Sequence, residues 1–301
     1  MITVLIAFGA NLLVAIGKTI AAVLTGSASM VAESAHSWAD AGNEVFLLIA
    51  ERRSARKPDA RHPLGYGKDA YIWSMFAAFG LFTAGAVVSI QHGIQELIDP
   101  EPADNFGIAY AVLAGAFVLE GVSFVQAFRQ TRSAARQRGR SVLGQVLQGS
   151  NPTVRAVFFE DAAALVGLLI AFLGVLAHQL TGSPVFDAIG SIAVGLLLGV
   201  VAIVLIDRNR QFLLGQAIDA PTHALVLQRL KDRPEIDRVT YLHLEFLGPE
   251  RLFLVAAIDL VGNAAEDDVA LTLRRLEREL EGHEFLGEVV MTLSAKDEPA
   301  L

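Results

Sequence analysis

An apolar stretch from Ser29 to Arg52 contains polar side chains of the types that bind metal ions. They recur at steps of three and four residues, which places them on one face of a helix: Glu33, His36, Asp40, Asn43 and Glu44. His36 and Asp40 are one turn apart, so an imidazole nitrogen and a carboxylate point toward the same place. An alternative is a polar seam that joins helices by hydrogen bonds, and we favour this for Asn43 alone. For His36 with Asp40, two ligand groups at ligand spacing favour a metal site.

The composition predicts a membrane protein with a soluble tail. The chain has 301 residues, 53% of them hydrophobic and 19% charged, and its mean hydropathy is +0.48. These values favour membrane spans over a soluble fold. The net charge of -8 is concentrated from Asp207 onward, a part of the chain that contains 11 Lys and Arg and 18 Asp and Glu. With this balance of acidic and basic residues, we expect no basic surface that could bind nucleic acid. There are no cysteines, so a metal would be bound by nitrogen and oxygen alone.

The hydropathy pattern predicts an α-helical, polytopic fold with six transmembrane helices, because six segments have about the 20 residues needed to cross the hydrocarbon. They are Met1–Leu24, Ser29–Arg52, Ala70–Leu97, Phe106–Arg129, Val154–Leu180 and Val185–Ile206. We therefore expect a transmembrane domain over residues 1–206. The remaining residues, 207–301, are expected to form a ferredoxin-like α+β domain of order αββαβ. Its helices are expected at Pro221–Asp232 and Glu266–Glu281, and its strands at Asp237–Phe246, Arg251–Leu260 and Glu288–Ser294.

The distribution of cations predicts the orientation. The segment after the second span contains Arg52, Arg53, Arg56, Lys57, Arg61 and Lys68, and the one after the fourth contains Arg129, Arg132, Arg136, Arg138 and Arg140. The segments on the other side contain Asp99, Glu101 and Asp104, or no charge. Lys and Arg favour the cytoplasmic side, so both basic segments and both termini are expected there. We interpret the start of the chain as a retained span and expect a multi-pass protein of the cell inner membrane.

Other polar residues within the spans have alternative interpretations. Lys18, late in the first span, can extend its ammonium to the interface, so we expect an anchoring role. Glu120 lies deep in the fourth span, and Glu160 and Asp161 lie in the first turns of the fifth. Asp187 opens the sixth span, where an anion stabilises a helix start.

Two motifs resemble those of the cation diffusion facilitator family of zinc and related metal transporters. One is GSASMVAESAHSWADAGNE (Gly26–Glu44), and the other is HPLGYGK (His62–Lys68). A third run, NPTVRAVFFEDAAALVG (Asn151–Gly167), is similar to the divergent branch that includes the mitochondrial zinc exporter. The resemblance covers essentially the whole chain. It implies divalent metal/proton antiport by a homodimer, with a tetrahedral site between the second and fifth helices.

The resemblance also implies ligands. His36 and Asp40 match the ligand pair of the second helix, and Asp161 matches one ligand of the fifth. The position four before Asp161 is Val157, which cannot bind metal. Glu160 is the fourth metal residue that we expect, although it points about 100° away from its neighbour on a regular helix. The alternatives for this ligand are Glu120, Asn43 and a water molecule.

One imidazole with carboxylates favours Zn²⁺ as the transported ion, with Fe²⁺, Co²⁺ or Mn²⁺ as alternatives. His36 is the expected proton carrier. No cofactor is expected beyond the transported cation. The terminal strand VVMTLSAKDE lacks the histidine by which family members often bind regulatory metal, so the tail is expected to serve in dimerisation. A membrane enzyme is disfavoured, because no span contains HExxH and the chain has neither GxSxG nor a P-loop. A metal sensor or scaffold that moves no ions is the remaining alternative.

Overall fold

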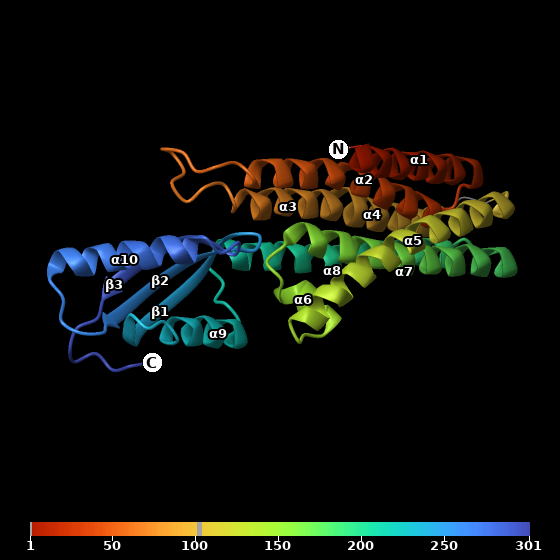
Figure 1. Cartoon of the computed structure of the whole chain (residues 1–301). Coiled ribbons are helices and arrows are strands. Elements are labelled where there is room, and N and C mark those ends of the chain that lie inside the picture. The colour runs from red at the N-terminus through yellow and green to blue at the C-terminus, as the bar shows by residue number, and fades with distance from the viewer. Residues whose placement is uncertain (1, 101–103) are drawn as a thin grey trace. The chain divides into compact units, whose positions relative to one another are not determined.

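The computed structural model describes residues 2–100 and 104–301, so Met1 and Glu101, both used above, lie outside it (Figure 1). The first part of the chain is helical: α1 (Ile2–Thr25), α2 (Ala28–Ser54), α3 (Asp69–Gly80), the π-helical η1 (Leu81–Val87), α4 (Val88–Ile98), α5 (Phe106–Gln137), α6 (Val142–Gln148), α7 (Pro152–Thr181) and α8 (Val185–Leu213). The last part is mixed: α9 (Ala220–Lys231), β1 (Ile236–Gly248), β2 (Arg251–Leu260), α10 (Glu266–Glu281) and β3 (Leu286–Leu293).

The chain folds into two compact units. The helical unit runs to Glu51 and resumes over Tyr71–Arg210. The second unit combines Gln211–Leu301 with Arg52–Ala70. The basic segment that follows α2 in sequence therefore belongs to the same unit as the C-terminal sheet.

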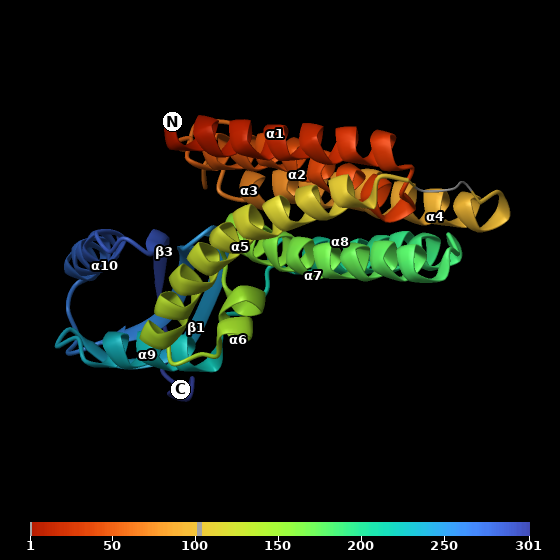
Figure 2. The same ribbon diagram turned by 90° about the vertical axis from the view of Figure 1, so that its right-hand side faces the viewer.

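The helical unit has the character of a membrane domain. Among the described residues, four helical stretches are long and apolar enough to cross a bilayer: 69–98, 106–137, 152–181 and 185–213. The long helices lie side by side, and α5 crosses its neighbours obliquely (Figures 1 and 2). Large apolar side chains of α5 point outward, among them Phe117, Val118, Leu119, Val122 and Val125. An exposed apolar face of this extent fits lipid rather than water, and the chain is a multi-pass membrane protein.

Helix α5 is longer than predicted. The sequence predicted a span that ends at Arg129 and a basic loop after it, but the helix continues to Gln137. The reason is local: Arg, Gln and Ala are good helix formers, and no Gly or Pro interrupts them before Gly139. That glycine has a φ of 62°, which suits the end of a helix. The short helix α6 follows and was not predicted.

Glycines allow α8 to approach η1 and α4 closely. A methyl group at Gly93 would lie 2.8 Å from the carbonyl oxygen of Ala188, and one at Gly195 would lie 2.9 Å from that of Ala86. Both obstacles are backbone atoms, so a side-chain rotation cannot remove them. Small residues at such contacts are typical of membrane helix packing.

The C-terminal unit is a three-stranded sheet with helices on one face. The strand order is β1-β2-β3, with β1 and β2 antiparallel and β2 and β3 parallel. The order of elements is the αββαβ predicted from the sequence. One face of the sheet packs with Leu230 of α9 and with Leu276 and Leu280 of α10. On the opposite face Tyr241 and Val290 are exposed.

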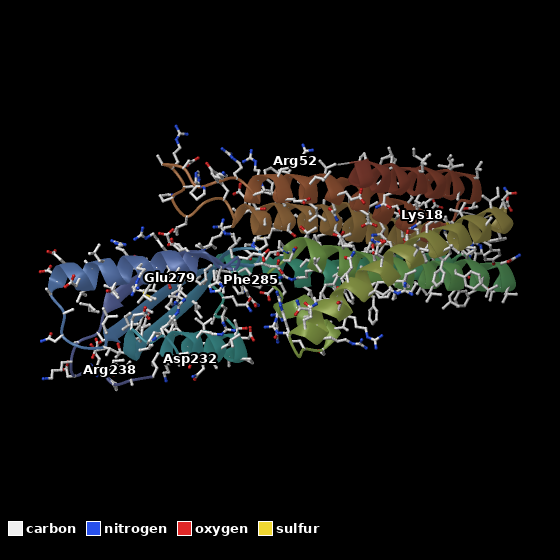
Figure 3. All side chains as sticks on the ribbon, in the orientation of Figure 1. Lys18, Arg52, Asp232, Arg238, Glu279 and Phe285 are labelled. Atoms are coloured by element: carbon white, nitrogen blue, oxygen red, sulfur yellow. The ribbon has the colours of Figure 1, made fainter. Side chains whose placement is uncertain are left out.

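Arg238 of β1, labelled in Figure 3, binds the segment that follows β3. Its Nε donates to Asp259 at 3.0 Å, and its other nitrogens donate to the carbonyl oxygens of Ala295, Lys296 and Glu298. The guanidinium thereby attaches the C-terminal segment to β1 and β2, in the multidentate way that suits arginine.

The segment between α2 and α3 packs on the β1–β2 turn. A methyl group at Gly67 would lie 2.4 Å from the carbonyl oxygen of Leu247, so only glycine fits at this contact. The ammonium of Lys68 donates to Glu245 Oε1 at 2.8 Å. This hydrogen bond is the main reason why the pKa of Glu245 is below its usual value.

We predict that Gly93→Ala and Gly195→Ala each destabilise the helical unit, because the added methyl group forces α8 away from its neighbours. The expected loss is about 1–3 kcal/mol, as for other overpacked cores, measured by thermal unfolding in detergent. Gly107→Ala and Gly115→Ala are matched controls, because no atom of the described residues lies within 4 Å of a methyl group at either position. Equal melting temperatures for all four variants would contradict the close contact.

We also predict a pH-dependent contribution from Glu245. Its folded-state pKa is lowered, so its stabilising effect is complete above the unfolded value of about 4.3 and is lost as the pH falls through the folded value. Because both partners are partly exposed, the pair contributes only about 0.2–1 kcal/mol. Glu245→Gln should speed hydrogen exchange around Lys68 at pH ~7, and the difference from the parent should shrink below pH ~4. The exposed Glu284→Gln serves as the control, and a difference that persists in acid would contradict the ionic origin.

Candidate metal site

Helix α2 carries the polar face predicted from the sequence, and Glu33, His36 and Asn43 on this face are buried. Its small alanines and serines let neighbouring helices approach closely. Its start is held by Asp187 of α8, whose Oδ1 accepts from the backbone N–H of Ser29 at 3.3 Å. The Ser29 hydroxyl donates to the Asp187 carbonyl oxygen at 2.9 Å. The sequence predicted that Asp187 stabilises the start of its own helix. The observed contact of its carboxylate is with the start of α2, across the interface from that helix.

Glu33 takes part in a buried ion cluster. Its Oε2 accepts from the ammonium of Lys18 on α1 at 2.9 Å, and the same ammonium donates to Glu120 Oε1 on α5 at 2.8 Å. The side chains of Lys18 and Glu33 are both fully buried. We call Lys18, Glu33 and Glu120 the lysine cluster. Removing one partner of a buried ion pair typically costs about 3–5 kcal/mol, because it leaves an uncompensated buried charge. The cluster therefore depends on all three members, which come from α1, α2 and α5.

The prediction that Lys18 anchors at the membrane interface is wrong. Lysine reaches the interface only where no partner of opposite charge lies nearer, and here two carboxylates surround it. A sequence signal for this pairing exists. Lys18 and Glu33 stand at nearly equal distances in sequence from the turn at Gly26, so two antiparallel helices bring them to the same depth.

Other polar side chains on this face have partners on different helices. Asn43 donates to Glu160 Oε1 at 3.0 Å, and Ser123 of α5 donates to Asp161 Oδ2 at 2.7 Å. Asn11 of α1 donates to Glu44. Adjacent acids on α7 therefore bind two different helices, and the helix needs no distortion to use both.

His36 differs from these neighbours. Its side chain is 0% exposed, and neither ring nitrogen has a hydrogen-bond partner in the described part of the chain. Its Nδ1 lies 3.4 Å from Asp40 Oδ1, an oxygen that is itself buried and without a hydrogen bond. Buried polar groups are normally paired. An imidazole and a carboxylate left free side by side are therefore suited to accept a cation.

The site residues predicted from the sequence interact electrostatically, but they do not form a complete set of metal ligands in this structure. Asp40 is within electrostatic range of both Glu160 and Asp161. Within residues 2–100 and 104–301, however, no three His, Asp or Glu side chains are close enough to bind one ion together. Val157 packs against the apolar core, as expected for a side chain that cannot bind metal.

The alternatives for the fourth ligand are engaged in different ways. Glu120 is held by Lys18, whereas Asn43 uses its amide nitrogen on Glu160. The sequence reasoning missed the lysine cluster, in which Glu120 has its main partner.

Comparison with known proteins identifies the family. The model of the cation efflux transmembrane domain matches residues 4–214. The chain belongs to the cation efflux family. This confirms the resemblance drawn from the motifs around His36 and Lys68. The family is one of transporters, not of enzymes.

Three relatives illustrate the breadth of the similarity. Metal tolerance protein C4 of Arabidopsis thaliana is 39% identical over 233 residues, which are 77% of this chain and 51% of the relative. A mitochondrial proton-coupled zinc antiporter of Xenopus laevis is 34% identical over 267 residues, 87% of this chain and 48% of the relative. The magnetosome protein MamB of Paramagnetospirillum magneticum is 24% identical over 247 residues, 82% of this chain and 78% of the relative. The chain spans about half the length of the first two relatives.

We predict that His36→Leu stabilises the metal-free protein. Leucine has a similar volume and leaves no buried nitrogen unpaired, which should raise the free energy of unfolding by about 1–3 kcal/mol. The same change should abolish any increase in melting temperature caused by Zn²⁺. Thermal unfolding with and without Zn²⁺ measures both effects.

His178→Leu is the matched control, because His178 is also buried but packs against Phe106 at the other end of α7. This variant should keep the response to Zn²⁺. A loss of the response in both variants, or in neither, would contradict a site at His36.

Proposed function

We propose that this protein moves a divalent metal cation, Zn²⁺ in the first place, across a membrane in exchange for protons. The observation that carries the proposal is the fully buried His36. Its ring nitrogens have no hydrogen-bond partner in the part of the chain that the structure describes, and it lies one helical turn from the unpaired Asp40 oxygen. A free imidazole and carboxylate inside a membrane helix bundle mark an ion path. Membership in the cation efflux family supports the same proposal.

The proposed ligands of the ion are His36, Asp40, Asp161 and Glu160. The two acids of α7 reach the ion by rotating away from Ser123 and Asn43, to which they are now hydrogen-bonded. Nitrogen and oxygen ligands in a tetrahedral arrangement suit Zn²⁺. Fe²⁺, Co²⁺ and Mn²⁺ accept similar donors, and transport assays with each ion distinguish them.

The chemistry of these ligands links metal binding to proton movement. His36 binds metal only when it is neutral, and the carboxylates only when they are ionised, so the arriving ion displaces protons. On the opposite side of the membrane, protons displace the metal in turn. His36, with a reference pKa of about 6.5, is the natural carrier. Rocking of the helices between two arrangements would expose the site to each side alternately.

The proposed membrane arrangement has six spans. Helices α1 and α2 would join the four apolar stretches, because polar side chains of α2 such as Glu33, His36 and Asn43 are buried within the bundle. The protein would lie in the inner membrane of the cell, with both termini and both basic segments on the cytoplasmic side. Residues 1–206 would form the transport domain and residues 207–301 the cytoplasmic domain.

The proposed role of the C-terminal domain is dimerisation. Its αββαβ order suits a ferredoxin-like fold, and its sheet has an open face that carries the exposed Tyr241 and Val290. A sheet face that carries exposed apolar side chains can pair with a second copy in a homodimer. Its histidines, at positions 223, 243 and 283, are scattered in the sequence, which disfavours a strong regulatory metal site.

We predict that His36→Ala and Asp40→Asn each abolish Zn²⁺-dependent proton flux in liposomes. Each variant lacks a ligand atom that must bind the metal ion and a proton alternately. Asp161→Asn should reduce the flux at least tenfold, which corresponds to about 1.4 kcal/mol. A pH-sensitive dye inside the vesicles reports the proton movement.

Asp99→Asn is the control, because it makes the same change of side chain at an exposed position. It should leave the flux unchanged. Flux that survives in both His36→Ala and Asp40→Asn would reject the site. Zn²⁺ binding without flux in the parent protein would instead identify a metal-binding scaffold.

A further inference from the structure

The lysine cluster contains a second set of cation ligands on the same polar face. Lys18 comes from α1, Glu33 from α2 and Glu120 from α5 (Lys18 is labelled in Figure 3). Its single ammonium is bound by one oxygen of each carboxylate. The structure therefore shows a cation bound at this position, and the cation is a side chain of the protein itself.

Each carboxylate of the cluster has an unused oxygen. Glu33 Oε1 and Glu120 Oε2 are buried, and neither has a hydrogen-bond partner among the residues that the structure describes. Space for Glu33 is provided by α7, because a methyl group at Gly167 would lie 2.6 Å from Glu33 Oε1. Two carboxylates, each with a buried spare oxygen, exceed the needs of one ammonium.

We propose that Glu33 and Glu120 form a latent divalent-cation site and that the ammonium of Lys18 occupies it permanently. The tethered ammonium binds one oxygen of each carboxylate and excludes a free ion. A transported cation then finds open ligands only at His36 and Asp40. Lys18 in this way restricts the polar face to one transported ion at a time.

The donor set determines which ion the vacated site would take. It offers carboxylate oxygens and no nitrogen, so it suits a hard cation such as Mn²⁺ better than Zn²⁺. The oxygens now lie 2.8 and 2.9 Å from the ammonium nitrogen. Metal–oxygen distances are roughly 2.0–2.6 Å, so small rotations of the two carboxylates would close them around a metal ion.

The test is a Mn²⁺ titration of the full chain in detergent micelles, with the signal of free Mn²⁺ followed by electron paramagnetic resonance. All variants carry Asp40→Asn, which disables the proposed transport site and separates this question from the proposed function. The variants are Lys18→Met, Lys18→Arg, and Lys18→Met combined with Glu33→Gln and Glu120→Gln. Lys18→Arg keeps a cation in place, and the combined variant removes the carboxylates.

The expected result is that Lys18→Met binds about one Mn²⁺ per chain more than the Asp40→Asn parent. Lys18→Arg and the combined variant should bind no more than that parent. Equal binding by Lys18→Met and the parent would overturn the proposal and leave the cluster as a purely structural tie between helices.

A failure of Lys18→Met to fold is also informative, because the proposal requires that a metal ion can replace the ammonium. If the variant is not monodisperse in metal-free buffer, it is purified with Mn²⁺ throughout. Recovery of a monodisperse protein, with Lys18→Arg folded in both buffers, supports the latent site. Failure to recover it in Mn²⁺ overturns the proposal.

Discussion

Polar groups in an apolar interior cost free energy unless they are paired, and this constraint governs the whole helical unit. Helix α2 brings a row of acids, an amide and an imidazole into the bundle, where water cannot satisfy them. Most find partners on a different helix: Glu33 on α1, Asn43 on α7 and Glu44 on α1. The pairs stabilise the bundle and, at the same time, determine which neighbours α2 has.

His36 differs from its neighbours on the polar face. Within the described residues neither of its ring nitrogens has a hydrogen-bond partner, whereas Glu33, Asn43 and Glu44 each have at least one. An unpaired buried group calls for an explanation, and binding of an exchangeable cation supplies one for His36. The polar face then has one cation that is fixed, the Lys18 ammonium, and one place for a cation that is exchanged.

Close helix packing makes this arrangement possible. Glycines at Gly93 and Gly195 allow backbone contact with α8, and Gly167 leaves the space that the Glu33 carboxylate occupies. Outside the helical unit, Gly67 plays a similar part, since only a glycine lets the segment after α2 lie on the β1–β2 turn. In each case a missing side chain, not an added contact, permits the approach.

The sequence by itself determined the periodic features. The spacing of His36 and Asp40 placed them on one helix face, and the alternation of apolar residues along β1 and β2 gave the strands and their buried sides. Helix α10 was predicted at its observed bounds, Glu266–Glu281, because an acidic first turn and a regular apolar stripe both mark it. These features depend on neighbours close in the chain, and a pattern of residues records them directly.

Only the tertiary structure decided the partners. The sequence could not show that Lys18 binds Glu33 and Glu120, that Asp187 holds the start of α2, or that Glu160 and Asp161 bind different helices. A buried charge pairs with whichever opposite charge lies at its depth and on the facing side. The depth of a side chain in the bundle and the helix that it faces depend on how the helices pack. Packing brings together residues that are far apart in the chain.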